Sequence, residues 1–352
     1  MELSFYKDKK VLITGHTGFK GTWMAEVLLQ LGAKVSGYAL DPPTEPNLFH
    51  LCRLSERMDS YIGDIRNLEN LKQVFENVQP EIVIHMAAQP LVRESYENPV
   101  YTYETNVMGT VNVLECVNAS DTVKSVVNVT TDKVYKNLEQ DVGYRETDEL
   151  NGYDPYSNSK SCSELVTSSY INSFLNEKGV SVSTVRAGNV IGGGDFAKDR
   201  IIPDCVRAVM NGEKIIIRNP YSIRPFQHVL EPVVVYLIVA MEQWQDAAKC
   251  GAYNVGPKDE DCWSTGELVE LFCKTWENVT GNSVKWINQH DGGPHEAGFL
   301  KLNCEKIQDI FGWQPKWDMK TNMEKIVSWT KAYMEGEDIL ACMDTQIAEY
   351  LR

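Results

Sequence analysis

A tyrosine and a lysine four residues apart are the strongest candidates for chemistry in this chain. Tyr156 and Lys160 enclose the segment YSNSK. On a helix, residues i and i+4 share one face, so the lysine ammonium can lie beside the phenol. A phenol has an ordinary pKa of about 10, and neighbouring positive charge lowers that pKa. The pair could then take a proton from a substrate hydroxyl, whereas Tyr153 has only Ser157 at the same spacing.

A glycine-rich segment near the start of the chain predicts a phosphate-binding turn. Residues 14–21 read TGHTGFKG, with glycines spaced G-x-x-G-x-x-G between an apolar run and a helical pattern. Glycines allow a tight turn and a close approach of backbone N–H groups to a pyrophosphate, whose charge the helix N-terminus favours. A simple tight turn is the alternative. The candidate cofactor contacts here are Gly15, Thr17, Gly18, Phe19, Lys20 and Gly21.

An acidic residue at the end of the second apolar run indicates which dinucleotide binds. Asp41 stands twenty residues after Gly21, where a carboxylate can bind the adenosine ribose and repel the additional phosphate of NADP. The prediction is therefore NAD, with a turn-forming aspartate before Pro42 as the alternative. Later turns add further candidate cofactor contacts, namely Asp64, Ile65, Ala87, Ala88 and Gln89.

Alternating strand and helix patterns must position these residues. The patterns predict strands at 11–14, 34–40, 81–87, 125–131 and 181–190, and helices at 22–31, 68–77, 99–117 and 157–174. Such alternation with apolar strands implies a parallel sheet covered on both faces. The regular pattern ends near residue 190. We therefore expect a dinucleotide-binding domain over 1–190 and a smaller lobe over 191–352, from which segments around 225–257 return to the first domain.

The composition argues against several classes of partner. The chain has 34 basic and 49 acidic residues, a formal net charge of −15, which is unfavourable for binding nucleic acids or anionic membranes. Its longest apolar run, 233–241, is too short to span a bilayer. The nine cysteines show neither a CxxC pair nor metal-ligand spacing. We therefore expect no metal site and a reducing, cytoplasmic environment.

Several segments together resemble the extended short-chain dehydrogenase/reductase family. TGHTGFKG, HMAAQP, the Tyr103-x-x-Asn106 helix, TTDKVY and YSNSK occur in that family's order. The resemblance to the CDP-glucose 4,6-dehydratases is closer, because it extends to RAGNVIGGGD, RNPYSIRPFQHVLEP and PHEAGFLKL. It implies a Rossmann-type doubly wound sheet with a smaller C-terminal substrate-binding lobe. It also implies tightly bound NAD, contacted by Asn106, Tyr156 and Lys160, and a homodimer formed by the helices at 99–117 and 157–174.

The resemblance also implies a reaction, in which CDP-glucose becomes CDP-4-keto-6-deoxyglucose and water. Tyr156 would take the 4-hydroxyl proton while NAD accepts and later returns a hydride. Thr131, Asp132 and Lys133 stand where related dehydratases have a Thr-Asp-Glu triplet that eliminates water. Lys133 replaces the glutamate, so its role as the base for the C5 proton is open. A structural ion pair with Asp132 is the alternative.

A nucleotide diphosphate needs cationic, preferably forked, donors in this acidic chain. Arg224 is the best candidate, followed by Asn189, Arg200 and Arg218, each weighed against a structural salt bridge. The preference for cytosine rests on the resemblance alone. His85 is expected to be a core residue, and no role follows for His228, His295 or Glu296.

Two other functions compete with the dehydratase interpretation. A nucleotide-sugar 4-epimerase or decarboxylase could use the same scaffold, but such enzymes usually carry small residues in place of Asp132 and Lys133. A non-catalytic NAD-sensing regulator belongs to a different class. Such a protein typically lacks the tyrosine–lysine pair that this chain retains at Tyr156 and Lys160.

Overall fold

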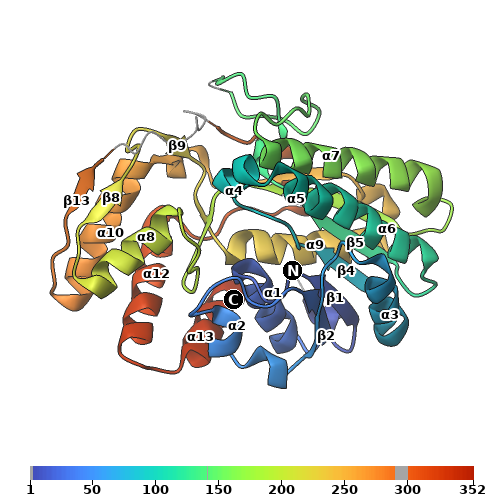
Figure 1. Ribbon diagram of the computed structural model, residues 1–352, viewed down its shortest axis with the longest axis horizontal. Coiled ribbons are helices and arrows are strands. Elements are labelled where there is room, and N and C mark those ends of the chain that lie inside the picture. Colours follow the sequence, from blue (N-terminus) through green and yellow to red (C-terminus); the bar gives the residue numbers. More distant parts are fainter. Residues whose placement is uncertain (1–2, 141, 290–299) are drawn as a thin grey trace.

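The protein is built around one parallel seven-stranded sheet. The computed structural model describes residues 3–140, 142–289 and 300–352. The strand order is β11-β6-β5-β4-β1-β2-β3, and every pairing in this sheet is parallel (Figure 1). This confirms the expected doubly wound α/β class. The strands are β1 (Lys10–Thr14), β2 (Lys34–Ala39), β3 (Asp59–Ile62), β4 (Ile82–His85), β5 (Ser125–Val129), β6 (Ser181–Ala187) and β11 (Ala252–Val255).

Alternate side chains of the strands pack into two separate cores. In β1, Val11 and Ile13 face a core shared with α1 (Phe19–Gln30) and α9 (Leu230–Gln245). Leu12 faces the opposite core, shared with α3 (Leu68–Val78) and α6 (Gly109–Ala119). This period of two follows from the strand geometry. Both faces are therefore apolar, which explains the uninterrupted hydrophobic strands.

A buried glutamine fixes α9 to the sheet. Gln243 donates to Ser125 Oγ at 2.8 Å and to the Val126 carbonyl at 2.9 Å, and accepts from Ser183 Oγ at 2.5 Å. These bonds reach both β5 and β6. A late segment of the chain is thus locked onto strands that come much earlier.

Two predicted helices are each interrupted by a π-helical turn. The pattern at 99–117 comprises α5 (Pro99–Tyr103), the π turn η3 (Glu104–Met108) and α6. The pattern at 157–174 comprises α7 (Pro155–Tyr170) and the π turn η5 (Ile171–Leu175). In η3, Asn106 bonds to both backbone groups of Gln89. Side-chain bonds of this kind are not visible in helical periodicity, and π turns often mark functional sites.

Other predicted boundaries shift near glycines. Helix α1 begins at Phe19, three residues before the predicted start, because Gly18 already serves as its N-cap. The predicted strand 181–190 ends at Ala187 and resumes as the short β7 (Val190–Ile191). The two residues between them turn the chain out of the main sheet.

The C-terminal half adds a small lobe with its own core beside the sheet (Figure 1, left). Its strands pair as β8 with β13 and β9 with β12, while β10 pairs with β7. Helix α13 lies near α1 and α2 (Figure 1). The helices and strands of this half, apart from α9, β11 and the short β7, are α8 (Ile201–Asn211), β8 (Ile215–Ile217), β9 (Ile223–Arg224), β10 (Gln227–His228), β12 (Trp263–Ser264), α10 (Thr265–Thr280), β13 (Trp286–Asn288), α11 (Glu305–Phe311), α12 (Met319–Met334) and α13 (Ile339–Leu351).

The remaining short elements are η1 (Leu3–Tyr6), α2 (Leu48–Leu51), η2 (Leu54–Glu56), α4 (Val92–Glu97), η4 (Asp132–Val134), η6 (Ala247–Lys249) and η7 (Asp259–Asp261). Within the described ranges, no helix has the length and apolarity needed to cross a membrane.

Candidate active site

The glycine-rich turn after β1 leaves space that side chains would fill. Gly15 has a φ of +84°, which favours glycine, and a Cβ on Gly21 would lie 2.1 Å from the Gly15 carbonyl oxygen. Gly18 is the N-cap residue of α1, so no N-cap side chain accepts a hydrogen bond from the first N–H groups of the helix. The first N–H groups of a helix have no partner within the helix. The turn therefore fits the pyrophosphate of a dinucleotide.

Two threonines hold this turn against neighbouring strand ends. Thr14 Oγ1 lies 2.7 Å from His85 Nδ1 and accepts from the N–H of Ala87 at 3.2 Å. Thr17 Oγ1 donates to the Leu40 carbonyl at 2.8 Å. The ends of β1, β2 and β4 are thus fixed relative to one another. Asp41 follows directly and is exposed, so its carboxylate is accessible to a ribose.

The other candidate cofactor residues divide into two groups. Ala87 and Ala88 are half-buried after β4, where a ligand can approach the backbone. The Asp64 carboxylate is bound by Arg66 at 2.7 Å. Ile65 is buried and accepts from Asn112 through its carbonyl at 2.9 Å.

The side chains of Asn106 and Gln89 form hydrogen bonds with other groups of the protein. Asn106 Oδ1 accepts from the Gln89 N–H at 2.8 Å, and Asn106 Nδ2 donates to Ser159 Oγ at 2.9 Å. Both residues are buried. Since Ser159 precedes Lys160, Asn106 joins the segment after β4 to α7.

Tyr156 and Lys160 lie in the first two turns of α7. The Asp154 side chain caps this helix by accepting from the Ser157 N–H at 3.0 Å, and Pro155 begins it. Burial lowers the pKa of Lys160 to about 8, against the opposing effect of Glu164. Lys160 Nζ donates to the Val129 carbonyl at 3.1 Å.

The protein alone does not lower the pKa of the tyrosine. Burial raises the pKa of Tyr156 to about 12, and the largest opposing cause is a hydrogen bond with Thr131. A general base requires the opposite shift. An additional positive charge, such as that of an oxidised nicotinamide, is therefore needed to favour the phenolate.

Asp132 is a buried carboxyl whose environment favours its protonated form. Its Oδ1 accepts from Thr131 Oγ1 at 2.9 Å, while its Oδ2 has no partner among the described residues. Burial raises the pKa of Asp132, and Lys133, Thr131 and Arg224 oppose this shift. A carboxyl group of this kind can donate a proton. Lys133 is half-buried in η4 beside it.

Lys20 reaches the same centre, although the sequence placed it with the glycine turn. Its Nζ donates to Tyr236 Oη at 3.2 Å. Burial, with the nearby charges of Lys160 and Arg200, lowers the pKa of Lys20 to about 7 against the opposing effect of Asp132. Several cations therefore face one carboxyl group, which favours the binding of an anionic ligand.

The four candidate substrate residues lie in different surroundings. Arg224 is buried on β9 and acts electrostatically on Asp132. Arg200 is half-buried and pairs with Asp195 at 3.0 Å. Arg218 pairs with Asp199 at 2.6 Å and lines a cavity of about 300 Å³ between α8 and β8.

Asn189 is half-buried between β6 and β7, where its carbonyl accepts from the Gln227 N–H at 3.0 Å. The structure thus brings Arg200 and Arg224 within electrostatic reach of the catalytic candidates.

Three residues at the site were not singled out from the sequence. A Cβ on Gly188 would lie 3.2 Å from Asp132 Oδ2 and 2.8 Å from Pro225, so glycine leaves room for the acid. Glu164 and Arg186 form a buried ion pair at 2.9 Å behind Lys160. The spacing of Glu164, one helical turn after Lys160, was a signal available in the sequence.

The histidines contribute little to the site. His85 is buried, as expected for a core residue, and burial lowers its pKa to about 3. His228 is likewise buried, between Trp23 and Trp317. His295 and Glu296 lie outside the described residues.

Comparison with known proteins places this geometry among enzymes of nucleotide-sugar metabolism. A family model described as GDP-mannose 4,6 dehydratase matches residues 12–326. The CDP-glucose 4,6-dehydratase of Salmonella typhimurium is 49% identical over 100% of this chain and 98% of that protein. The CDP-paratose 2-epimerase of Salmonella typhi is 26% identical over 92% of this chain and 99% of that protein.

A solved structure of dTDP-glucose 4,6-dehydratase from Bacillus anthracis, in complex with NAD, has a TM-score of 0.77 at 22% identity. The match covers 94% of this chain and 99% of that one. This likeness shows that the two proteins share a fold.

A substitution at Gly18 tests the cofactor turn without disturbing the fold. A Cβ there would make only an ordinary contact of 3.5 Å with the Gly15 carbonyl. We expect Gly18→Ala to keep the wild-type melting temperature but to weaken NAD binding roughly tenfold or more, because the added methyl separates the backbone from the pyrophosphate. Calorimetric titration with NAD measures this. Gly256→Ala, with a similar contact of 3.6 Å at Cys304, is the control. Unchanged affinity in Gly18→Ala would place the cofactor elsewhere.

Proposed function

Because this chain belongs to the GDP-mannose 4,6 dehydratase family, we propose that it is a 4,6-dehydratase that converts CDP-glucose into CDP-4-keto-6-deoxyglucose and water. The substrate follows from the similarity to the Salmonella CDP-glucose 4,6-dehydratase, which extends over both chains. The observation that carries the reaction type is the buried Asp132, whose Oδ2 has no partner among the described residues and which shares Thr131 with Tyr156.

The cofactor of this proposal is NAD. When bound, NAD accepts a hydride from C4 of the glucose ring and returns it to C6. The glycine turn at Gly15, Gly18 and Gly21 would hold its pyrophosphate, and Asp41 would bind its ribose. Tyr156 and Lys160 would lie beside its nicotinamide. The structural relative from Bacillus anthracis was solved in complex with NAD, which supports this choice.

Tyr156 begins the reaction by taking the proton from the sugar 4-hydroxyl. Its hydrogen bond with Thr131 stabilises the phenolate, and positive charge in the occupied site must supply the remaining preference. Lys160, in the second turn of α7, adds one such charge while it remains an ammonium. The resulting 4-keto group makes the proton on C5 acidic.

Asp132 and Lys133 then eliminate water across C5 and C6. Asp132, whose pKa is raised by burial, donates its proton to the departing 6-hydroxyl. Lys133 takes the C5 proton on its side-chain nitrogen. Return of the hydride to C6 and of a proton to C5 completes the product, so no external reductant is consumed.

The diphosphate of the substrate would be bound by cations of the C-terminal lobe. Arg224 and Arg200 lie within electrostatic reach of the catalytic residues. Arg218 and Asn189 are further candidates for the nucleotide end of the substrate. The exposed cavity beside Arg218 is also lined by Arg207 and Lys214, which supports this placement.

We also infer a cytoplasmic homodimer. The nine cysteines are all free, which fits a reducing compartment. Large apolar side chains are exposed along α5, η3, α7 and η5, which a second copy of the chain would cover. These side chains are Val100, Met108, Leu165 and Phe174.

A comparison of substrates tests the proposed activity. We expect CDP-glucose to be converted faster than dTDP-, GDP- or UDP-glucose, without net consumption of NAD, as measured by the absorbance that 4-keto sugars develop in alkali. Tyr156→Phe should lower the rate by roughly 10²–10⁴-fold and leave NAD binding intact, because only the proton acceptor is lost. Interconversion of CDP-glucose and its C4 epimer without this absorbance would instead indicate an epimerase.

Substitution of the acid and the base separates elimination from the first oxidation. We expect Asp132→Asn and Lys133→Met each to slow product formation by roughly 10²-fold or more. The initial oxidation should persist, so the absorbance of reduced nicotinamide should accumulate in a single turnover. If either residue were only structural, its variant would show a lower melting temperature and weaker binding without this accumulation. Normal elimination in Lys133→Met would exclude Lys133 as the base.

Light scattering tests the homodimer. At micromolar concentration we expect twice the chain mass of 39.8 kDa. Leu165→Glu should shift the protein toward the monomer, because the charge would be buried at the interface. Ile216→Glu, at a similarly exposed apolar side chain on β8, serves as the control and should remain dimeric. A monomeric wild-type protein would contradict the proposal.

A further inference from the structure

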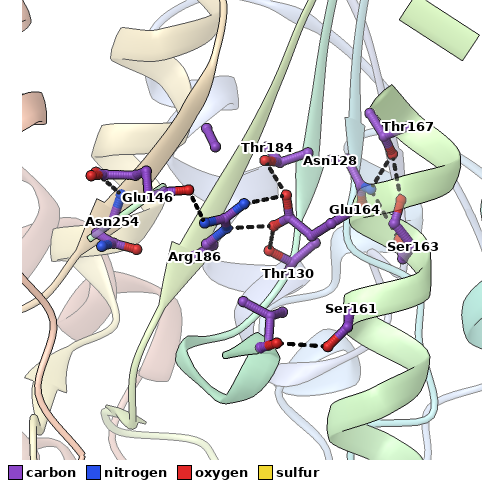
Figure 2. Close-up of polar contacts among 12 residues, drawn as sticks. Asn128, Thr130, Glu146, Ser161, Ser163, Glu164, Thr167, Thr184, Arg186 and Asn254 are labelled. Carbon is purple, nitrogen blue, oxygen red and sulfur yellow. Dashed lines mark hydrogen bonds and ion pairs between the residues drawn. The ribbon is translucent and has the colours of Figure 1, made fainter. Parts of the chain in front are cut away.

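The Glu164 carboxylate is saturated with hydrogen bonds one helical turn behind Lys160. Arg186 donates to both of its oxygens, from Nε to Oε1 and from Nη2 to Oε2, each at 2.9 Å. Thr184 Oγ1 donates to Oε2 at 2.6 Å, and Thr130 Oγ1 donates to Oε1. Figure 2 shows the carboxylate enclosed by these three side chains. The acid and the guanidinium are both almost completely buried.

These bonds join the two segments that carry the catalytic candidates. Glu164 belongs to α7, the helix of Tyr156 and Lys160. Thr130 directly precedes Thr131 and Asp132 at the end of β5. Together with the bond from Lys160 to the Val129 carbonyl, this carboxylate therefore holds the helix at a set distance from the strand end. A displacement of about 1 Å between catalytic groups can cost on the order of 10²-fold in rate.

The guanidinium extends the same network toward the C-terminal half. Arg186 Nη1 donates to Tyr135 Oη at 2.8 Å and to the Glu146 carbonyl at 3.1 Å. Tyr135 donates in turn to Asn254 Oδ1 at 2.7 Å on β11. Hydrogen bonds thus satisfy both buried charges, as a buried ion pair requires.

Glu164 also opposes the effect of burial on Lys160. Burial lowers the pKa of Lys160 to about 8, and Glu164 raises it. Lys160 in turn acts electrostatically on Lys20 from α1 and on His85 from β4. Burial lowers the pKa of His85 to about 3, so this ring is neutral. Lys20 is a like charge whenever it is protonated. The carboxylate is therefore the group that favours the ammonium.

We propose that Glu164 is a positioning residue of the dehydratase, which keeps Lys160 an ammonium and holds the Tyr156–Lys160 face of α7 in register with Thr131 and Asp132. This inference rests on the proposed function, since it concerns the same site. The role of Lys160 in promoting the Tyr156 phenolate requires its positive charge. Activity must then fall as pH rises through the pKa of Lys160. Loss of the Glu164 charge must move that fall to lower pH.

Two variants test this electrostatic role. Glu164→Gln removes the charge but leaves the Arg186 guanidinium buried without its partner, which can prevent folding. The double variant Glu164→Gln/Arg186→Met removes both charges together and should fold. We expect the alkaline limb of kcat for CDP-glucose to move down by about one pH unit in the double variant. The matched control is Thr184→Val, which removes one hydrogen bond from the same carboxylate but keeps both charges. Thr184→Val should keep the alkaline limb of kcat at the wild-type pH.

A measurement without substrate separates this inference from the proposed function. Titration of lysine Cε resonances by NMR, with Lys160 assigned by its loss in Lys160→Met, reports the ionisation of Lys160 directly. We expect its pKa to be about one unit lower in the double variant than in wild type. Such a shift in a protein that does not turn over CDP-glucose would refute the activity and support the role of Glu164. Unchanged Lys160 titration and an unchanged pH limb in the folded double variant would overturn the inference.

Discussion

The carboxyl ends of parallel strands converge at one edge of the sheet, and each group of the site depends on this convergence. The glycine turn follows β1, the Ala87–Gln89 segment follows β4, and Thr131–Lys133 follows β5. Parallel pairing fixes the spacing of these ends, and Thr14 joins two of them through His85 and Ala87. The helix α7, which carries Tyr156 and Lys160, must be added from outside the sheet. The Glu164–Arg186 pair provides that connection, because its partners come from both β5 and β6.

The same loss of water produces opposite effects on the acid and on the cations. Burial raises the pKa of Asp132 and lowers the pKa of Lys20 to about 7 and of Lys160 to about 8. Desolvation disfavours whichever form is charged. Burial thus favours the protonated form of Asp132, the proposed acid, and brings the two amines closer to neutrality. A bound diphosphate would favour the charged amines again, which links binding of the anionic substrate to the ionisation of the site.

The parts of the site that the sequence predicted are encoded locally. The glycine turn and the Tyr156–Lys160 pair depend on spacing within one element, and the alternating pattern was sufficient for the doubly wound fold. The π turn η3 was missed because Asn106 bonds to a segment after β4, which periodicity does not report. The position of Lys20 was also missed, since it depends on Tyr236 far along the chain. For the same reason the pKa of Tyr156 could not be deduced from its neighbour on the helix alone.

Gly188 lies beside Asp132, the proposed acid of the elimination, where the chain enters its C-terminal half. The chain leaves the main sheet at this residue, between β6 and β7. Any side chain here would approach Pro225 within 2.8 Å and Asp132 Oδ2 within 3.2 Å. Pro225 directly follows β9, which ends at Arg224. The close approach of Pro225 to Gly188 therefore links the position of β9 to the space around Asp132. A larger residue would either push the lobe outward or turn the acid away. In the proposed mechanism, close packing of the lobe would keep Asp132 facing the substrate and would exclude water from the step in which a hydroxyl departs.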